Sequence, residues 1–147
     1  MPDKNKKRSG IIKEKATEYL VHKPGDKHSS HPDFEKRKDN IKLLKSFSDL
    51  PKGWNGNGAK SISLSLINRC IDLISFPDLN YQPDIFPTAR ESIQFEYEKP
   101  DGSYLEIEVY EDNISYLYIT KNGEETEHES ADWQDILRLI YEFHTTG

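Results

Sequence analysis

Sulfur and metal-ligating residues are scarce in this chain, which has one cysteine, one methionine and five scattered histidines among 147 residues. A single thiol cannot form an intramolecular disulfide. Cys70 lies among Ile67, Ile71 and Ile74, so we expect it to be a small buried hydrophobe and not a nucleophile. The histidines have neither the i, i+4 spacing nor the neighbouring cysteines that are typical of a structural zinc site. We therefore expect no metal and no cofactor.

Long apolar runs are missing as well. No stretch approaches the ~18 to 20 apolar residues that a membrane span requires, and the lysine-rich start, Met1 to Arg8, is not followed by the apolar segment of a secretory signal. These absences lead us to expect a soluble, cytoplasmic protein. The hydrophobic content of 34% is enough for one domain with a core, but it indicates that part of the chain stays outside that core.

Recognisable catalytic patterns are absent from the sequence. No Ser/His/Asp or Cys/His set is placed by spacing, and glutamates that alternate along a wet strand face are not desolvated enough to become a catalytic pair. The glycine-rich segment 53–61 is not a phosphate-binding P-loop, because Ala59 separates Gly58 from Lys60 and an amphipathic helix precedes the segment. The sequence thus favours a non-enzymatic protein, and a small enzyme whose site is invisible in sequence stays an alternative.

The net charge of −6 conceals an uneven distribution along the chain. Residues 1–52 hold 14 Lys and Arg against 8 Asp and Glu, a net charge of +6, whereas residues 53–147 hold 6 against 18, a net charge of −12. A basic arm joined to an acidic body can fold onto that body, reach for an anionic partner or keep the chain soluble.

We predict a basic N-terminal arm over residues 1–33 and a single α+β domain over residues 34–147. In the arm, Pro24-Gly25 and Ser29 to Pro32 are breakers, and the apolar residues before them fall at helical spacing over two or three turns. The arm is either a mobile leader, a segment that orders on a partner, or a segment that docks on its own acidic body.

Two helices are predicted between the arm and the strands. Asp33 is expected to cap the first, which ends near Ser48 or Asp49, ahead of Leu50-Pro51. Ser61 or Ser63 is expected to cap the second, which runs to about Ser75 and is apolar on two sides.

The stretch from Glu91 to Lys121 contains three consecutive runs of strand-like character and predicts a β-meander. Residues 124–129 are a fourth, polar edge strand or a loop, and a final helix capped by Ser130 follows. The predicted fold is α+β, with two N-terminal helices, a three- to four-stranded antiparallel meander, a C-terminal helix and the basic arm. The helices should cover the sheet face that carries Ile93, Phe95, Leu105, Ile107 and Val109.

The opposite face of the predicted sheet interleaves acidic and aromatic residues and is expected to face water. Tyrosine is a rigid, amphipathic contact residue, and the lack of Lys and Arg among the rings favours a protein partner over nucleic acid. Its tyrosines are Tyr104 and Tyr110, joined by Tyr116 or Tyr118, and the alternative is that these tyrosines lie under a helix with the glutamates around their rim. The partner-binding candidates are Ile11, Ile12, Tyr19 and Leu20 in the arm and Glu96, Tyr104, Glu106, Glu108 and Tyr110 in the sheet.

The glycine-rich segment predicts a tight corner between the two helices. Its Asn-Gly pairs suit positions with positive φ, and Trp54 is expected to pack into the body. The structural corner residues are Trp54, Asn55, Gly56, Asn57 and Gly58.

The run from Leu50 to Ala59, followed by a helix and by the Pro83–Thr88 connector into strands, resembles a set of small bacterial proteins of unknown function with a Gly-Trp-Asp-Gly-Tyr-Gly-Ala core. The resemblance covers residues 45–145, and Asn55 and Asn57 stand where that core has aspartate and tyrosine. It implies a recurring bacterial domain of accessory, antitoxin or phage-related type, with no catalytic residues to carry over.

These observations lead to the hypothesis of a protein-binding module of antitoxin, immunity or inhibitor type that acts on a basic toxin or effector. A secretion chaperone or an accessory subunit of a bacterial complex is an alternative. A nucleic-acid binder that uses Lys4, Lys6, Lys7 and Arg8 is less favoured, because the acidic body repels phosphate.

Overall fold

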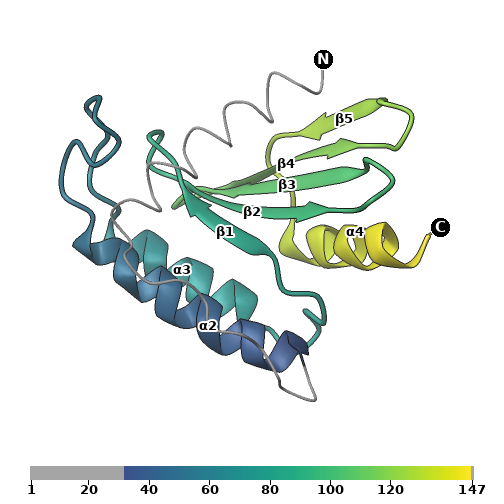
Figure 1. The fold of residues 1–147 in the computed structure, drawn as a ribbon, viewed down its shortest axis with the longest axis horizontal. Coiled ribbons are helices and arrows are strands. Elements are labelled where there is room, and N and C mark those ends of the chain that lie inside the picture. Colours follow the sequence, from purple (N-terminus) through teal and green to yellow (C-terminus); the bar gives the residue numbers. More distant parts are fainter. Residues whose placement is uncertain (1–31, 147) are drawn as a thin grey trace.

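The computed structural model describes residues 32–146, so the arm candidates Ile11, Ile12, Tyr19 and Leu20 lie outside the described residues. In the described range the fold is α+β, with three α-helices and one five-stranded antiparallel sheet (Figure 1). The helices are α2 (Pro32–Ser46), α3 (Leu64–Ile74) and α4 (Trp133–Thr145), and a 3-10 turn, η1 (Phe47–Asp49), extends α2. The strands are β1 (Asp84–Pro87), β2 (Ile93–Glu98), β3 (Tyr104–Val109), β4 (Ile114–Ile119) and β5 (Glu125–His128).

The sheet is a simple meander in the order β1-β2-β3-β4-β5, and the three predicted runs form its centre. The prediction of three to four strands is wrong, because the connector before β2 also pairs: Ile85 lies opposite Phe95. The prolines of that connector keep the chain extended, and an edge strand tolerates Pro87 because one of its sides needs no ladder hydrogen bonds. Residues 125–128 form the polar strand β5 on the other edge.

All three helices lie on the same face of the sheet (Figure 1). That face is the predicted one, with Ile93, Phe95, Leu105, Ile107 and Val109 in a single core cluster with buried residues of all three helices. The helix residues of this cluster are Leu44 of α2, Leu66, Ile67, Cys70 and Ile74 of α3, and Ile136, Ile140 and Phe143 of α4. Burial raises the pKa of the Cys70 thiol, in keeping with its predicted role as a small hydrophobe.

The helix starts agree with the sequence prediction only at α3, where the Ser63 hydroxyl accepts a hydrogen bond from the Leu66 amide at 3.1 Å. Asp33 lies inside the first turn of α2, which begins at Pro32, a residue suited to a helix start because it has no amide hydrogen to satisfy. Ser130 does not cap α4, whose N-cap is Asp132. The amide of Ala131 still donates to the carbonyl of Ile114 in β4 at 2.7 Å, so the helix begins only after that contact.

Two turns of the sheet hold the ends of helices. The ammonium group of Lys99, in the β2–β3 turn, donates to the carbonyls of Phe143 at 2.7 Å and Thr146 at 3.0 Å, where a cation complements the C-terminus of α4. At the β3–β4 turn, the Glu111 carboxylate accepts from the Ser63 hydroxyl at 2.6 Å and its carbonyl accepts from Arg69 at 2.9 Å. These contacts fix the helix layer on one face and leave the other face to β-strand side chains.

Candidate interaction surface

The sheet face opposite the helices is called the outer face here, and strand register defines it. Residues directly opposite each other on neighbouring strands point to the same side of a sheet. The outer face therefore consists of Asp84 and Phe86 on β1, Gln94, Glu96 and Glu98 on β2, Tyr104, Glu106 and Glu108 on β3, Ser115, Leu117 and Ile119 on β4, and Glu125 and Glu127 on β5. Seven of these thirteen residues are acidic and none is Lys or Arg.

Three carboxylates form a row across the outer face. Asp84 lies opposite Glu96, and Glu96 lies opposite Glu106, on the consecutive strands β1, β2 and β3. Neighbouring strands are about 4.8 Å apart, so the row spans only about 10 Å at the backbone. Like charges directly opposite each other destabilise a sheet. This row concentrates negative charge on the β1 to β3 part of the outer face.

The prediction that these glutamates face water is wrong, because Glu96 and Glu106 are 6% exposed and Glu108 is 8% exposed. Polar neighbours on the same face surround Glu106: its carboxylate accepts from the Tyr104 hydroxyl at 2.7 Å and from the Gln94 amide at 3.1 Å. Alternation in a sequence predicts which face a residue occupies, but the exposed fraction depends on what lies beside it and above it.

Apolar side chains run beside the carboxylates. Tyr104 (2% exposed), Leu117 (5%) and Ile119 (2%) form a cluster separate from the main core. Tyr116 and Tyr118, considered with the outer face in the sequence analysis, lie instead on the helix side, where the ring of Tyr118 meets Phe143 edge-on at 5.9 Å. Sequence analysis missed Leu117 and Ile119, although a β4 that is apolar or aromatic on both faces was the signal for them.

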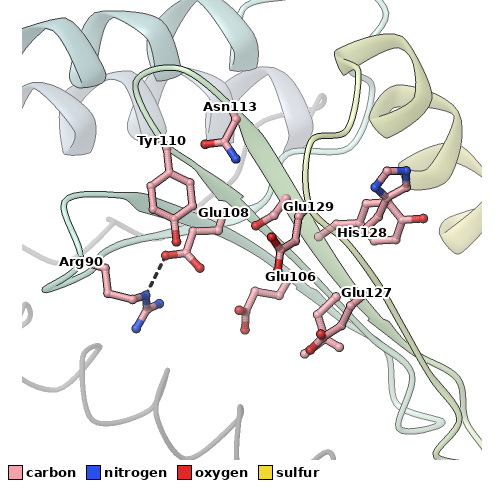
Figure 2. A pocket seen from close by; sticks show the side chains of 11 residues that line it. Arg90, Glu106, Glu108, Tyr110, Asn113, Glu127, His128 and Glu129 are labelled. Atoms are coloured by element: carbon pink, nitrogen blue, oxygen red, sulfur yellow. Dashed lines mark hydrogen bonds and ion pairs between the residues drawn. The ribbon is translucent and has the colours of Figure 1, made fainter.

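A polar cluster closes one end of the outer face. Arg90 donates through Nε to the Glu108 carboxylate at 2.9 Å, and the Ser92 hydroxyl donates to the same oxygen (Figure 2 draws the Arg90 contact). Burial by itself lowers the pKa of Arg90, but the hydrogen bond and charge of Glu108 outweigh that effect and the pKa is raised. Burial, and then the charge of Glu108, raises the pKa of the nearby Tyr110 phenol. Sequence analysis missed this arginine because it lies in a turn 18 residues from Glu108.

A hollow of about 460 Å³ adjoins this cluster and extends across β3 and β4 to β5. Figure 2 shows the carboxylates of Glu106, Glu108, Glu127 and Glu129 around it, with Arg90 at one end. Carboxylates are strong acceptors for ammonium and guanidinium groups. The hollow is therefore chemically suited to the side chain of a lysine or arginine.

The glycine-rich corner is held closed by a buried tryptophan and by an asparagine side chain. Trp54 is fully buried in the main core, and its indole NH donates to the carbonyl of Lys60 at 3.3 Å. Gly56 and Gly58 adopt φ values of 80° and 84°, which other residues rarely adopt. The Asn55 side-chain oxygen accepts from the amides of Asn57 at 2.9 Å and Ala59 at 3.1 Å, so one acceptor holds the loop closed.

Replacing Asn55 with Ala is expected to lower the free energy of unfolding by about 1 to 3 kcal/mol, because two loop amides lose their acceptor. Asn55→Asp keeps an oxygen in the same place and should stay near wild type. Asn57→Ala, at the exposed neighbouring asparagine, is the control and should also be close to wild type. Urea unfolding measures all three, and equal losses for Ala and Asp at residue 55 would contradict the role assigned to this oxygen.

The residues 32–146 contain no group of three or more His, Cys, Asp and Glu side chains arranged to hold a metal ion. Over the same residues, no helix combines the length and apolar content needed to cross a membrane.

The resemblance of residues 50–59 to the bacterial Gly-Trp-Asp-Gly-Tyr-Gly-Ala core has a local structural meaning. Asn55 supplies the acceptor oxygen that an aspartate would supply there, so this departure preserves the geometry of the loop. Membership of that set of proteins stays a prediction. No protein-family model, curated protein or solved structure matches this chain.

Proposed function

We propose that this chain is a non-enzymatic protein-binding module whose outer face binds a basic segment of a partner protein. The observation that carries this proposal is the row of Asp84, Glu96 and Glu106 on three neighbouring strands. Such a row brings three carboxylates together on neighbouring strands, and carboxylates are strong acceptors for ammonium and guanidinium groups, so the row suits a surface that binds cations.

The chemistry of the face defines the kind of segment that fits it. Lysine and arginine side chains pair with the carboxylates, and one of them enters the hollow between β3 and β5. Apolar side chains of the same segment pack on Tyr104, Leu117 and Ile119. The ligand is thus an amphipathic, basic protein segment.

Charge also determines which partners reach the face. Residues 53–147 carry a net charge of −12, which attracts a basic protein over distances near the Debye length and speeds association. The same charge repels the phosphates of nucleic acid. A protein that blocks a basic toxin or effector, as an antitoxin, an immunity protein or an inhibitor does, needs these properties.

The test begins with affinity capture by the tagged full chain in its native cells, followed by purification of the captured partner. We expect the variant Glu96→Gln/Glu106→Gln to bind that purified partner about tenfold more weakly or worse, with a reduced dependence on salt, because buried charge pairs contribute strongly to interfaces. The control Asp72→Asn/Glu142→Gln removes two exposed carboxylates from the helix layer and changes the net charge equally. Its affinity should stay within about twofold of wild type, because exposed charges contribute little at short range.

Unchanged affinity of the Glu96/Glu106 variant would overturn the proposal, as would a captured partner with an acidic binding segment. A partner that is held only in an unfolded state would instead favour a secretion chaperone.

A further inference from the structure

The middle of the outer face is buried although none of the described helices covers it, whereas Asp84, Glu98, Glu125 and Glu127 at its margins are exposed. Its apolar cluster of Tyr104, Leu117 and Ile119 is 2 to 5% exposed, whereas α2, α3 and α4 all lie on the opposite side of the sheet (Figure 1). The apolar cluster and the carboxylates beside it fit an occupant that has both apolar and basic groups.

Residues 1–31 of the same chain have the composition that this face requires. They contain eight Lys and Arg against four Asp and Glu, a net charge of +4. Their apolar residues include Ile11, Ile12, Tyr19 and Leu20, spaced so that they can contact one surface together. The seven carboxylates of the outer face complement the positive charge of the segment, and the apolar cluster complements its apolar residues.

The point where the segment joins the body also allows it to reach the outer face. The segment joins the body at Pro32, the first residue of α2, and Lys36 in the next turn pairs with Asp84 on the outer face at 2.8 Å. Four strand spacings make the sheet about 19 Å wide, and 31 residues of extended chain reach roughly 100 Å. The segment is thus long enough to cross every strand of the sheet from its own tether.

We propose that residues 1–31 dock on the outer face of their own chain and occupy the site that a basic partner uses. The apolar side chains pack on Tyr104, Leu117 and Ile119, and the lysines pair with the carboxylates around them. A short tether gives such a segment an effective concentration in the millimolar range, so weak contacts suffice to hold it. The partner has to displace the segment. The apparent affinity of the partner is therefore its intrinsic affinity multiplied by the fraction of chains whose outer face is open. The competition between the segment and a partner rests on the proposed function, whereas the docking itself does not.

Thermal unfolding of the intact chain distinguishes an occupied outer face from an open one, because the Tm of one variant should fall in the first case and rise in the second. If a basic segment covers the face, Glu96→Gln/Glu106→Gln removes attraction, and we expect Tm to fall by about 4 °C or more. If the face is open to water, the same change removes repulsion between opposite glutamates, while a glutamine oxygen at position 106 still accepts from the Tyr104 hydroxyl, and Tm rises. A rise would overturn the docking proposal.

A second pair of changes tests the two sides of the contact together. Lys13→Gln/Lys15→Gln in the segment should also lower Tm, and combining it with the Glu96/Glu106 change should lower Tm by less than both effects added, because the same interactions are already lost. Additive effects would overturn direct contact between the two groups. The control Lys42→Gln/Lys45→Gln, on α2, should add independently of the face variant.

Zero-length carbodiimide cross-linking of the dilute full chain identifies the occupant. We expect amide links between lysines of residues 1–31 and carboxylates of the outer face within monomers, lost in high salt and in the Glu96/Glu106 variant. Links found only in dimers would mean that a second copy covers the face, and an absence of links to β2 and β3 would overturn the proposal.

The two proposals fail separately. Intramolecular links together with a partner whose affinity is indifferent to Glu96→Gln/Glu106→Gln would leave the docking standing and remove the proposed function. A partner that needs these glutamates, with no intramolecular links and no change in affinity for Lys13→Gln/Lys15→Gln, would do the reverse.

Discussion

Replacing Ile107 with Asp is expected to leave the chain unfolded at 25 °C. Ile107 is fully buried at the centre of β3, the middle strand of the sheet, with Phe95 and Tyr116 directly opposite on either side. Losing a buried isoleucine side chain costs about 2 to 5 kcal/mol, and an unpaired buried carboxylate adds several more. Together these losses approach the whole stability of a typical domain, about 5 to 15 kcal/mol.

Circular dichroism and thermal melting measure the outcome, with Leu64→Asp as the matched control. Leu64 is 64% exposed and begins α3, where a negative charge is favourable near the helix N-terminus. The control should therefore melt like the wild type. A cooperative melt of the Ile107→Asp chain within a few degrees of wild type would mean that the two sheet faces are assigned the wrong way round.

Alternation of apolar and polar residues was sufficient to assign the sheet faces, because it follows from strand geometry alone. Side chains of a strand point to opposite faces in turn, so Phe95 and Ile107 had to share a face with each other and not with Glu106. The helix layer could be assigned to that face for the same reason. Periodicity is a local property, and these parts of the fold depend only on it.

Features that depend on pairing between distant residues could not be predicted. The row of carboxylates exists because β1 pairs with β2 and brings Asp84 opposite Glu96, but the prolines around residue 84 indicated a connector. Predicting the apolar cluster of Leu117 and Ile119 required knowledge of the register of β4 against β3, because β4 is apolar or aromatic on both faces. The hydrogen bonds of Glu106 likewise depend on the side chains of Tyr104 and of Gln94 on the neighbouring strand.

A competing hydrogen bond to β4 explains why α4 does not begin at its predicted cap, Ser130. Ser130 is a good capping residue by type, but at φ 140° it lies in strained backbone between β5 and α4. The following amide is held by β4, so a tertiary hydrogen bond determines where the helix begins. The capping preference of a residue is a local property, so it could not predict that tertiary contact.

Replacing Trp54 with Ala is expected to lower the free energy of unfolding by about 3 to 5 kcal/mol, the usual loss for a fully buried aromatic side chain. Trp54 lies in the main core and its indole NH closes the corner by donating to Lys60. Truncation leaves a cavity in the main core and also leaves that carbonyl without its donor. The corner links the two helices, so the loss should appear in the whole domain and not only in the loop.

Urea unfolding of Trp54→Ala and Trp54→Phe separates the two contributions. The phenylalanine fills most of the cavity but cannot donate a hydrogen bond, so its loss should lie between wild type and the alanine variant. Trp54 belongs to the core on the helix side of the sheet. Folded Trp54→Phe chains should therefore bind a basic partner with wild-type affinity, whereas the Glu96/Glu106 variant should not. A loss below about 1 kcal/mol for Trp54→Ala would contradict its position in the core, because large-to-small changes at fully buried aromatic sites cost more than that.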